Sequence, residues 1–158
     1  GKIIENNCRK RLTNTKKPVI MYSEIKKTKE MTMATRATYQ FNVDMMTQTF
    51  YIHHDGYPTG AAEYFDNALN LVNSSGSSFA AKFIRANAKA DFTDSHESHG
   101  DTDYRYTVRR DSPSGEFMIH VEQVEYDHKA NRRFRTRFDG SISEFIVNNL
   151  TVAVFKSA

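Results

Sequence analysis

The stretch from Thr49 to Phe65, TFYIHHDGYPTGAAEYF, constrains the fold more than any other part of this chain. It begins with alternating apolar and polar side chains, which are typical of a half-buried strand, and it ends with apolar residues at helical spacing. Between these patterns lies Asp55-Gly-Tyr-Pro58, whose glycine and proline predict a sharp corner. Folds often place recognition groups at such corners. The residues predicted to lie there are His53, His54, Asp55 and Tyr57.

Length and composition predict a single globular domain. The chain has 158 residues, of which 39% are hydrophobic, enough for one core but too few for two independent ones. It contains no apolar run of about 18 residues that could span a membrane, and its N-terminal residues lack a secretory signal pattern. The lone Cys8 cannot form an internal disulfide, which is typical of a reducing compartment. We therefore expect a soluble, cytoplasmic protein with no membrane partner.

Charge divides the chain into two parts. Nine of the 22 Lys and Arg residues and three of the 19 Asp and Glu residues lie in residues 1–32, so this segment has a net charge of +6 and residues 33–158 carry −3. We interpret residues 1–32 as a basic N-terminal extension, with Val19–Tyr22 as a candidate edge strand, and residues 33–158 as a single domain. A basic arm either keeps the chain soluble or contacts nucleic acid or an acidic partner.

Periodicity over residues 33–158 predicts an α+β fold. Period-two patterns predict strands over 34–41, 47–53, 104–110, 116–124 and 132–138, and apolar spacing predicts helices over 60–72 and 79–90. Thr59 is predicted to cap the first helix. Ser141 and Glu144 form a capping box for a short helix that ends at Asn148, and a last strand is predicted over 151–156. The expected architecture is an antiparallel sheet of about five to six strands with two to three helices packed on one face.

The strands between residues 104 and 138 place apolar residues on one face and arginines on the other. Phe134 and Phe138 belong to the predicted apolar face, and Arg133, Arg135 and Arg137 to the opposite face. The turns predict four cross-strand pairs: Arg109–Glu116, Arg105–His120, Glu122–Arg133 and His120–Arg135. Two interpretations stay open, a basic stripe that follows an acidic backbone and a ladder of opposite charges on a solvated face. No exposed aromatic residue is expected to alternate with these arginines and stack bases.

Histidines and carboxylates form two clusters in the sequence. One is His53-His54-Asp55, and the other is the polar loop from Asp94 to Asp103, which contains His96, His99 and Asp101. Imidazole and carboxylate groups are ligands of zinc, manganese and iron. Because the spacing matches no metalloenzyme motif, the alternative is a loop whose polar residues make turns and caps. We expect no cofactor.

Sequence motifs give little support to catalysis. Cys8 has no neighbouring histidine, and the chain contains neither a Gly-x-Ser-x-Gly motif nor a glycine-rich phosphate loop. The Asp55–Pro58 corner itself has two interpretations. It is either a turn that joins strand and helix or an aromatic, polar recognition patch around Tyr57. Arg36, on the neighbouring predicted strand, is expected to pair with Asp55.

Two motifs resemble a group of small, functionally uncharacterised phage and prophage proteins. Those proteins begin with M-A-T-R-[AS]-T and carry Y-x-H-x-D-G-Y-P, to which Met33–Thr38 and Tyr51–Pro58 correspond in this sequence. The match covers mainly residues 33–65. Residues 1–32 depart from it, because members usually begin near that methionine. The resemblance implies a mobile-element setting, in which small accessory proteins act by binding.

Three functional hypotheses follow. The resemblance implies a non-enzymatic phage protein, such as an anti-CRISPR or similar anti-defence inhibitor, that binds a host protein complex in the bacterial cytoplasm through the Asp55–Pro58 corner and the 94–103 loop. The second hypothesis is a nucleic-acid-binding regulator that uses residues 1–32 and the stripe of Arg133, Arg135 and Arg137. The third is a metal-dependent hydrolase or nuclease that uses His96, His99 and Asp101.

Overall fold

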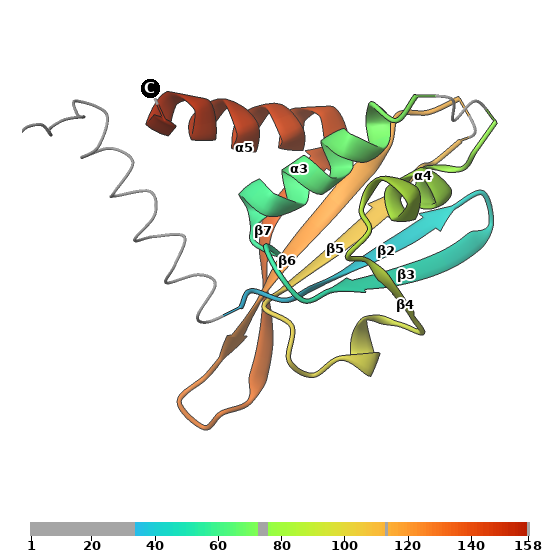
Figure 1. Cartoon of the computed structure of the whole chain (residues 1–158). Helices are drawn as coiled ribbons and strands as arrows, with labels where there is room; N and C mark the ends of the chain where they lie inside the picture. The colour runs from blue at the N-terminus through green and yellow to red at the C-terminus, as the bar shows by residue number, and fades with distance from the viewer. Residues whose placement is uncertain (1–33, 73–75, 113, 158) are drawn as a thin grey trace, which may run out of the picture. The chain divides into compact units, whose positions relative to one another are not determined.

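Six strands and three α-helices make up the described part of the chain, which a computed structural model shows over residues 34–72, 76–112 and 114–157 (Figure 1). In chain order the elements are β2 (Ala37–Val43), β3 (Met46–Ile52), α3 (Pro58–Leu69), α4 (Phe79–Ala86), β4 (Asp91–Thr93), the 3-10 helix η2 (His96–Ser98), β5 (Tyr104–Arg109), β6 (Met118–Tyr126), β7 (Arg132–Ser141) and α5 (Ile142–Ser157). The predicted extension over residues 1–32 and its candidate edge strand Val19–Tyr22 lie outside the described residues.

The strands form one sheet in the order β4-β3-β2-β5-β6-β7. Only the central pair β2–β5 is parallel, and every other neighbouring pair is antiparallel. The three helices cover one face of the sheet, and η2 lies on the opposite face (Figure 1). The predicted α+β class is therefore confirmed. No helix in the described part of the chain is long and apolar enough to cross a membrane.

Alternation along the central strands builds the core. Tyr39 of β2 and Tyr106 of β5 are paired in register and fully buried under the helices. Their rings stack with centroids 4.9 Å apart, and Phe65 of α3 and Phe83 of α4 pack against Tyr39. Removing such side chains from water contributes about 25 cal/mol per Å² of apolar surface. This aromatic core fixes which residues face outward on the other side of the sheet, which we call the outer face.

The start of α3 and the end of α4 differ from their predictions. α3 begins at Pro58, with Tyr57 at the N-cap and no side-chain cap, so the predicted Thr59 cap is wrong. Proline suits the first helical position because it has no backbone N–H, and an N–H at that position would have no partner within the helix. α4 ends at Ala86 because Asn87 leaves the helical conformation, with φ of −126° and ψ of 87°, and its side-chain amide donates to the carbonyls of Phe83 at 2.8 Å and Tyr64 at 3.0 Å.

The C-terminal segment is one helix rather than a helix followed by a strand. Ser141 accepts a hydrogen bond from the Glu144 backbone at 3.1 Å, as predicted, but α5 then runs without a break from Ile142 to Ser157. The predicted strand over 151–156 is therefore wrong. Phe145 and Ile146 pack into the core on the helix side. The prediction of a strand rested on the β-propensity of residues 151–156, and β-propensity depends strongly on context.

Strand register differs from the prediction on both sides of β6. Arg105 lies opposite Glu122 and Arg109 opposite Met118, a shift of two residues that leaves the predicted faces of β5 and β6 unchanged. In the β6–β7 pair the register jumps between Val121 and Glu122, so the facing residue changes from Phe138 to Thr136 and Arg137 becomes the extra residue of a β-bulge. None of the four predicted cross-strand pairs forms.

Close packing at the Asp55–Pro58 corner predicts the outcome of one substitution. An alanine Cβ at Gly56 would lie 2.7 Å from the Ala37 side chain and 2.9 Å from the Arg36 carbonyl carbon, so the backbone must move to accept it. We expect Gly56→Ala to lower the free energy of unfolding by about 1–3 kcal/mol, the usual cost of overpacking. Chemical denaturation measures this change. Gly100→Ala is the matched control, because its added Cβ meets nothing within 4 Å; an equal loss in both variants would contradict the prediction.

Candidate functional site

Both sequence clusters of histidines and carboxylates contribute to one surface on the outer face of the sheet. Arg36 precedes β2, Tyr51 and His53 lie at the end of β3, and the segment between β4 and β5 contributes His99 and Asp101. Contacts described below join all five side chains. We call these five residues the outer-face cluster.

His96 anchors the segment between β4 and β5 to the sheet. Its side chain is buried, with Nδ1 2.6 Å from the Thr38 hydroxyl of β2 and Nε2 3.0 Å from the Thr107 hydroxyl of β5. Burial, together with the nearby Arg105 guanidinium, lowers the pKa of His96 to about 4. The imidazole is therefore neutral near pH 7, with one nitrogen donating and the other accepting. Both threonines suit this state, because a hydroxyl can serve either role.

Tyr51 lies at the centre of the outer-face cluster. Its ring stacks on the His99 ring at a centroid distance of 3.9 Å and an interplanar angle of 7°. The Tyr51 hydroxyl donates to Asp101 at 3.1 Å and lies 3.3 Å from His53 Nδ1. Burial, followed by the negative charge of Asp101, raises the pKa of Tyr51, so the phenol stays protonated and acts as a donor.

Arg36 closes the network of the outer-face cluster. Its Nε atom lies 3.1 Å from Asp101 and 3.2 Å from His53 Nδ1. The side chains of Arg36 and Asp101 are 32% and 54% exposed, so these contacts are made at the surface and each is worth little in stability. Their combined effect is to fix the positions of side chains that solvent still reaches.

The Asp55–Pro58 corner supports the cluster from the helix side. Asp55 adopts a left-handed backbone conformation with φ of 57°, and the following Gly56 is buried. The Gly56 backbone donates to Thr35 at 2.9 Å and accepts from the Tyr106 hydroxyl at 2.6 Å. These bonds attach the corner to the two central strands. The corner thus serves as a turn that joins β3 to α3, which is the first of the two interpretations given for it.

Two expectations for the corner need correction. Asp55 accepts from the Tyr57 hydroxyl at 3.4 Å, whereas Arg36 contacts His53 and Asp101, so the predicted Arg36–Asp55 pair is wrong. The reason is that Asp55 turns toward the helix side of the sheet. Tyr57 is partly buried, while His53 and His54 are exposed, with their rings 4.6 Å apart and nearly perpendicular. The histidines, rather than Tyr57, are the most accessible groups at the corner.

The contacts of His96, His99 and Asp101 do not favour a metal site. Both ring nitrogens of His96 contact threonine hydroxyls, and His99 Nε2 lies 2.9 Å from the Thr93 hydroxyl. Asp101 binds Tyr51 and Arg36 instead of turning toward either histidine. Over the ranges that the structure describes, no three His, Cys, Asp or Glu residues gather closely enough to hold a metal ion.

The arginines of β7 do not form a continuous stripe. Arg133 pairs with Asp127 at 3.0 Å and Arg135 pairs with Glu125 at 3.2 Å, so the ladder interpretation holds for these two, with partners other than those predicted. Arg137 is the bulge residue, and its exposed side chain makes no ion pair or hydrogen bond with the described residues.

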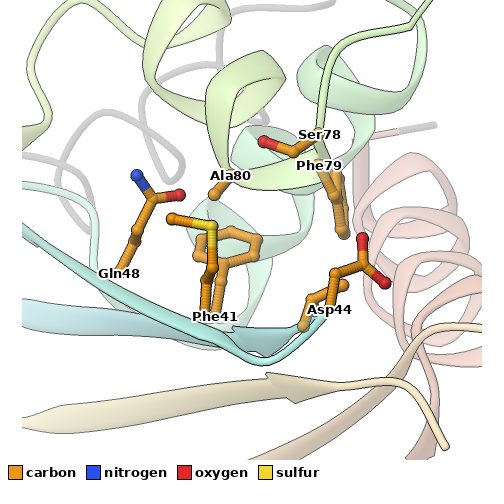
Figure 2. A pocket seen from close by; sticks show the side chains of 8 residues that line it. Phe41, Asp44, Gln48, Ser78, Phe79 and Ala80 are labelled. Atoms are coloured by element: carbon orange, nitrogen blue, oxygen red, sulfur yellow. The ribbon is translucent and has the colours of Figure 1, made fainter.

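A small pocket lies away from all of these residues. It has a volume of about 80 Å³ and lies between the β2–β3 hairpin and the start of α4 (Figure 2). Phe41, Val43 and Phe79 are among its lining residues, and Asp44 at its rim pairs with Arg110 at 2.9 Å. Small-molecule sites usually have volumes of about 300–1,000 Å³. The pocket is therefore too small to suggest a substrate site.

Sequence reasoning did not name Tyr51 as a site residue, although it lies two positions before His53 on the same strand pattern. Its stacking partner His99 lies 48 positions later in the numbering, and no local pattern links the two. Comparisons of the chain with protein-family models, with curated proteins and with solved structures find no match. The functional argument therefore depends on the geometry of the surface.

Acidification is expected to destabilise the domain through His96. Above the ordinary histidine pKa of 6.5 the side chain is neutral in both states, so its contribution is constant. Below that pH only the unfolded chain takes up the proton, and the free energy of unfolding falls until the pH reaches the folded-state pKa of about 4. The total effect is about 3 kcal/mol.

Denaturant titrations across this pH range would measure the loss. His96→Gln is expected to be less stable near neutral pH but to depend less steeply on pH. His54→Gln, at an exposed histidine, is the matched control and should keep the wild-type slope. A His96→Gln variant with the wild-type pH dependence would show that another group is responsible.

Proposed function

We propose that this domain is a binding protein whose recognition surface is the outer-face cluster together with His54. The single observation that supports this most is the network around Tyr51, which holds aromatic, cationic and anionic groups in fixed positions while leaving them accessible. Preorganised side chains lose less conformational entropy on association. Tyrosine and arginine are also the residue types most enriched at energetically important positions of protein interfaces.

We favour a protein partner over a small molecule for this surface. The cluster lies on the outer face of the sheet, away from the small pocket beside α4, and its donors and acceptors already satisfy one another. A polar and aromatic surface of this kind suits a protein interface, where contacts spread over about 800 Å² per partner. Proton-transfer chemistry is less well supported, because the raised pKa of Tyr51 keeps its hydroxyl protonated near neutral pH.

The partner we propose is a component of a bacterial defence complex of CRISPR type, which this protein would inhibit in the host cytoplasm. Support for this setting comes from the resemblance of residues 33–65 to phage and prophage proteins. The same resemblance includes Arg36, Tyr51, His53 and the corner that supports them. An inhibitor of this kind needs only a stable interaction surface, without chemistry of its own.

A capture experiment tests the surface. Wild-type protein and the variants His53→Ala/His54→Ala and Asn148→Ala would be used to retrieve partners from bacterial lysate, with identification by mass spectrometry. Asn148 is exposed on α5, on the helix side of the sheet, and serves as the matched control. For a partner then purified, we expect the double histidine variant to weaken binding at least tenfold, which corresponds to about 1.4 kcal/mol. Equal capture by wild type and the double variant would contradict the assignment.

A plasmid-interference assay separately tests the proposed setting. Cells that carry a CRISPR-type system directed against a plasmid should regain transformation when they express the wild-type chain or Asn148→Ala. The double histidine variant should not restore it. If wild type has no effect although its partner capture depends on the histidines, the surface is correct and the defence setting is wrong.

A further inference from the structure

The β-bulge at Arg137 changes what the outer part of the β6–β7 hairpin shows to solvent. Phe138 lies on the core side of the bulge, where it faces the helices and packs on Phe145 of α5 with ring centroids 5.4 Å apart. Past the bulge, Phe134 is on the outer face, where the Arg105 guanidinium lies 4.2 Å from its ring centre. The prediction that Phe134 belongs to the apolar core face is therefore wrong. We call residues 122–137, from the bulge outward, the β6–β7 ribbon.

Two aromatic side chains of the β6–β7 ribbon are accessible. Tyr126 is 59% exposed and Phe134 is 44% exposed. The register pairs Tyr126 with Arg132 and Val124 with Phe134, so the two aromatics are diagonal neighbours on the same face of the hairpin. Diagonal neighbours are separated by about 7–8 Å, which is comparable to the spacing of bases in an extended single strand. The expectation that no exposed aromatic accompanies the arginines is also wrong.

The β6–β7 ribbon has more basic than acidic residues, so some of its cationic side chains form no ion pair within it. It contains five Lys and Arg residues against three Asp and Glu residues, a net charge of +2. Asp127 is occupied within the hairpin, because it accepts from the backbone of Lys129 and Asn131 and pairs with Arg133. No side-chain partner is found for the exposed Lys129 or Arg137 among the described residues.

The hairpin projects beyond the rest of the sheet. β5 pairs with β6 only as far as Gln123, so Glu125 and Tyr126 pair with β7 alone (Figure 1). Arg132 lies opposite Tyr126 in the register and 5.5 Å from the centre of the Phe134 ring, and its guanidinium donates to the His99 carbonyl at 3.4 Å. Exposed aromatic rings together with the exposed cations Lys129 and Arg137 on one two-stranded element suit a ligand with flat π-faces and a negatively charged backbone.

We propose that the β6–β7 ribbon binds single-stranded nucleic acid. Tyr126 and Phe134 would each stack on an unpaired base, while Lys129 and Arg137 contact phosphates. A duplex offers no free base faces to these rings, so it is a weaker ligand. The β6–β7 ribbon touches the outer-face cluster where Arg132 donates to the His99 carbonyl. None of the four residues proposed to contact the ligand belongs to that cluster, so the proposal stands whether or not the cluster binds a protein.

Fluorescence anisotropy with a labelled oligonucleotide of about 16 nucleotides, at the upper end of the usual site size, tests the proposal on the full chain. Residues 1–32, with their net charge of +6, add background affinity, so the informative quantity is the difference between variants. We expect Tyr126→Ala to weaken binding about tenfold at every salt concentration. The double variant Lys129→Gln/Arg137→Gln should reduce the slope of log affinity against log salt by about 1.4, because each phosphate contact on a single strand contributes about 0.7.

Lys89→Gln is the matched control, since it removes one exposed charge from the connection between α4 and β4. It should retain the wild-type slope. Circular dichroism and thermal unfolding should be unchanged in every variant, because the substituted side chains are exposed. The proposal is overturned if Tyr126→Ala binds as wild type does, or if the double variant and Lys89→Gln have the same slope. Binding of polyglutamate as tightly as the oligonucleotide, unaffected by Tyr126→Ala, would indicate an acidic protein partner and also reject it.

Discussion

The stacked pair of Tyr39 and Tyr106 is the contact on which the rest of this structure depends. The two rings come from the parallel central strands and lie at 10° to one another, with Phe65 and Phe83 of the helices packed around them. Burial raises the pKa of both phenols well above its ordinary value, so neither ionises inside the core. The Tyr106 hydroxyl also bonds Gly56, which connects the sheet centre to the corner from which α3 begins.

The same two strands determine the opposite face. Thr38 precedes Tyr39, Thr107 follows Tyr106, and alternation turns both threonines away from the core and toward His96. The aromatic core and the anchor of the segment between β4 and β5 therefore share one register. A slip of one residue in either strand would bury a threonine among the aromatics and expose a tyrosine. The hydrophobic core thus places the strands that carry the outer-face cluster, and the contacts within the cluster then fix its side chains.

Period-two and period-3.6 patterns were sufficient to predict the α+β class, the core faces of β3, β5 and β6, and the existence of α3 and α4. They also placed Arg36 on a strand next to β3, although the partner predicted for it was Asp55 rather than His53 and Asp101. Three features left no local signal. The bulge adds one residue without a glycine or proline to mark it, α5 continues after Asn148 through residues of high β-propensity, and the Tyr51–His99 stack joins segments that only the finished fold brings together. The bulge and the stack depend on contacts between residues distant in sequence, which periodicity does not encode.

The extra residue at Arg137 divides the β6–β7 hairpin into a part whose side chains belong to the core and a part whose side chains do not. On the helix side of it, Val121 and Phe138 share neighbours with the whole core, so a substitution there disturbs several elements at once. Farther out, residues of the two strands have mainly each other and solvent as neighbours. Substitutions can accordingly accumulate at the projecting tip while the folding of the domain is left intact.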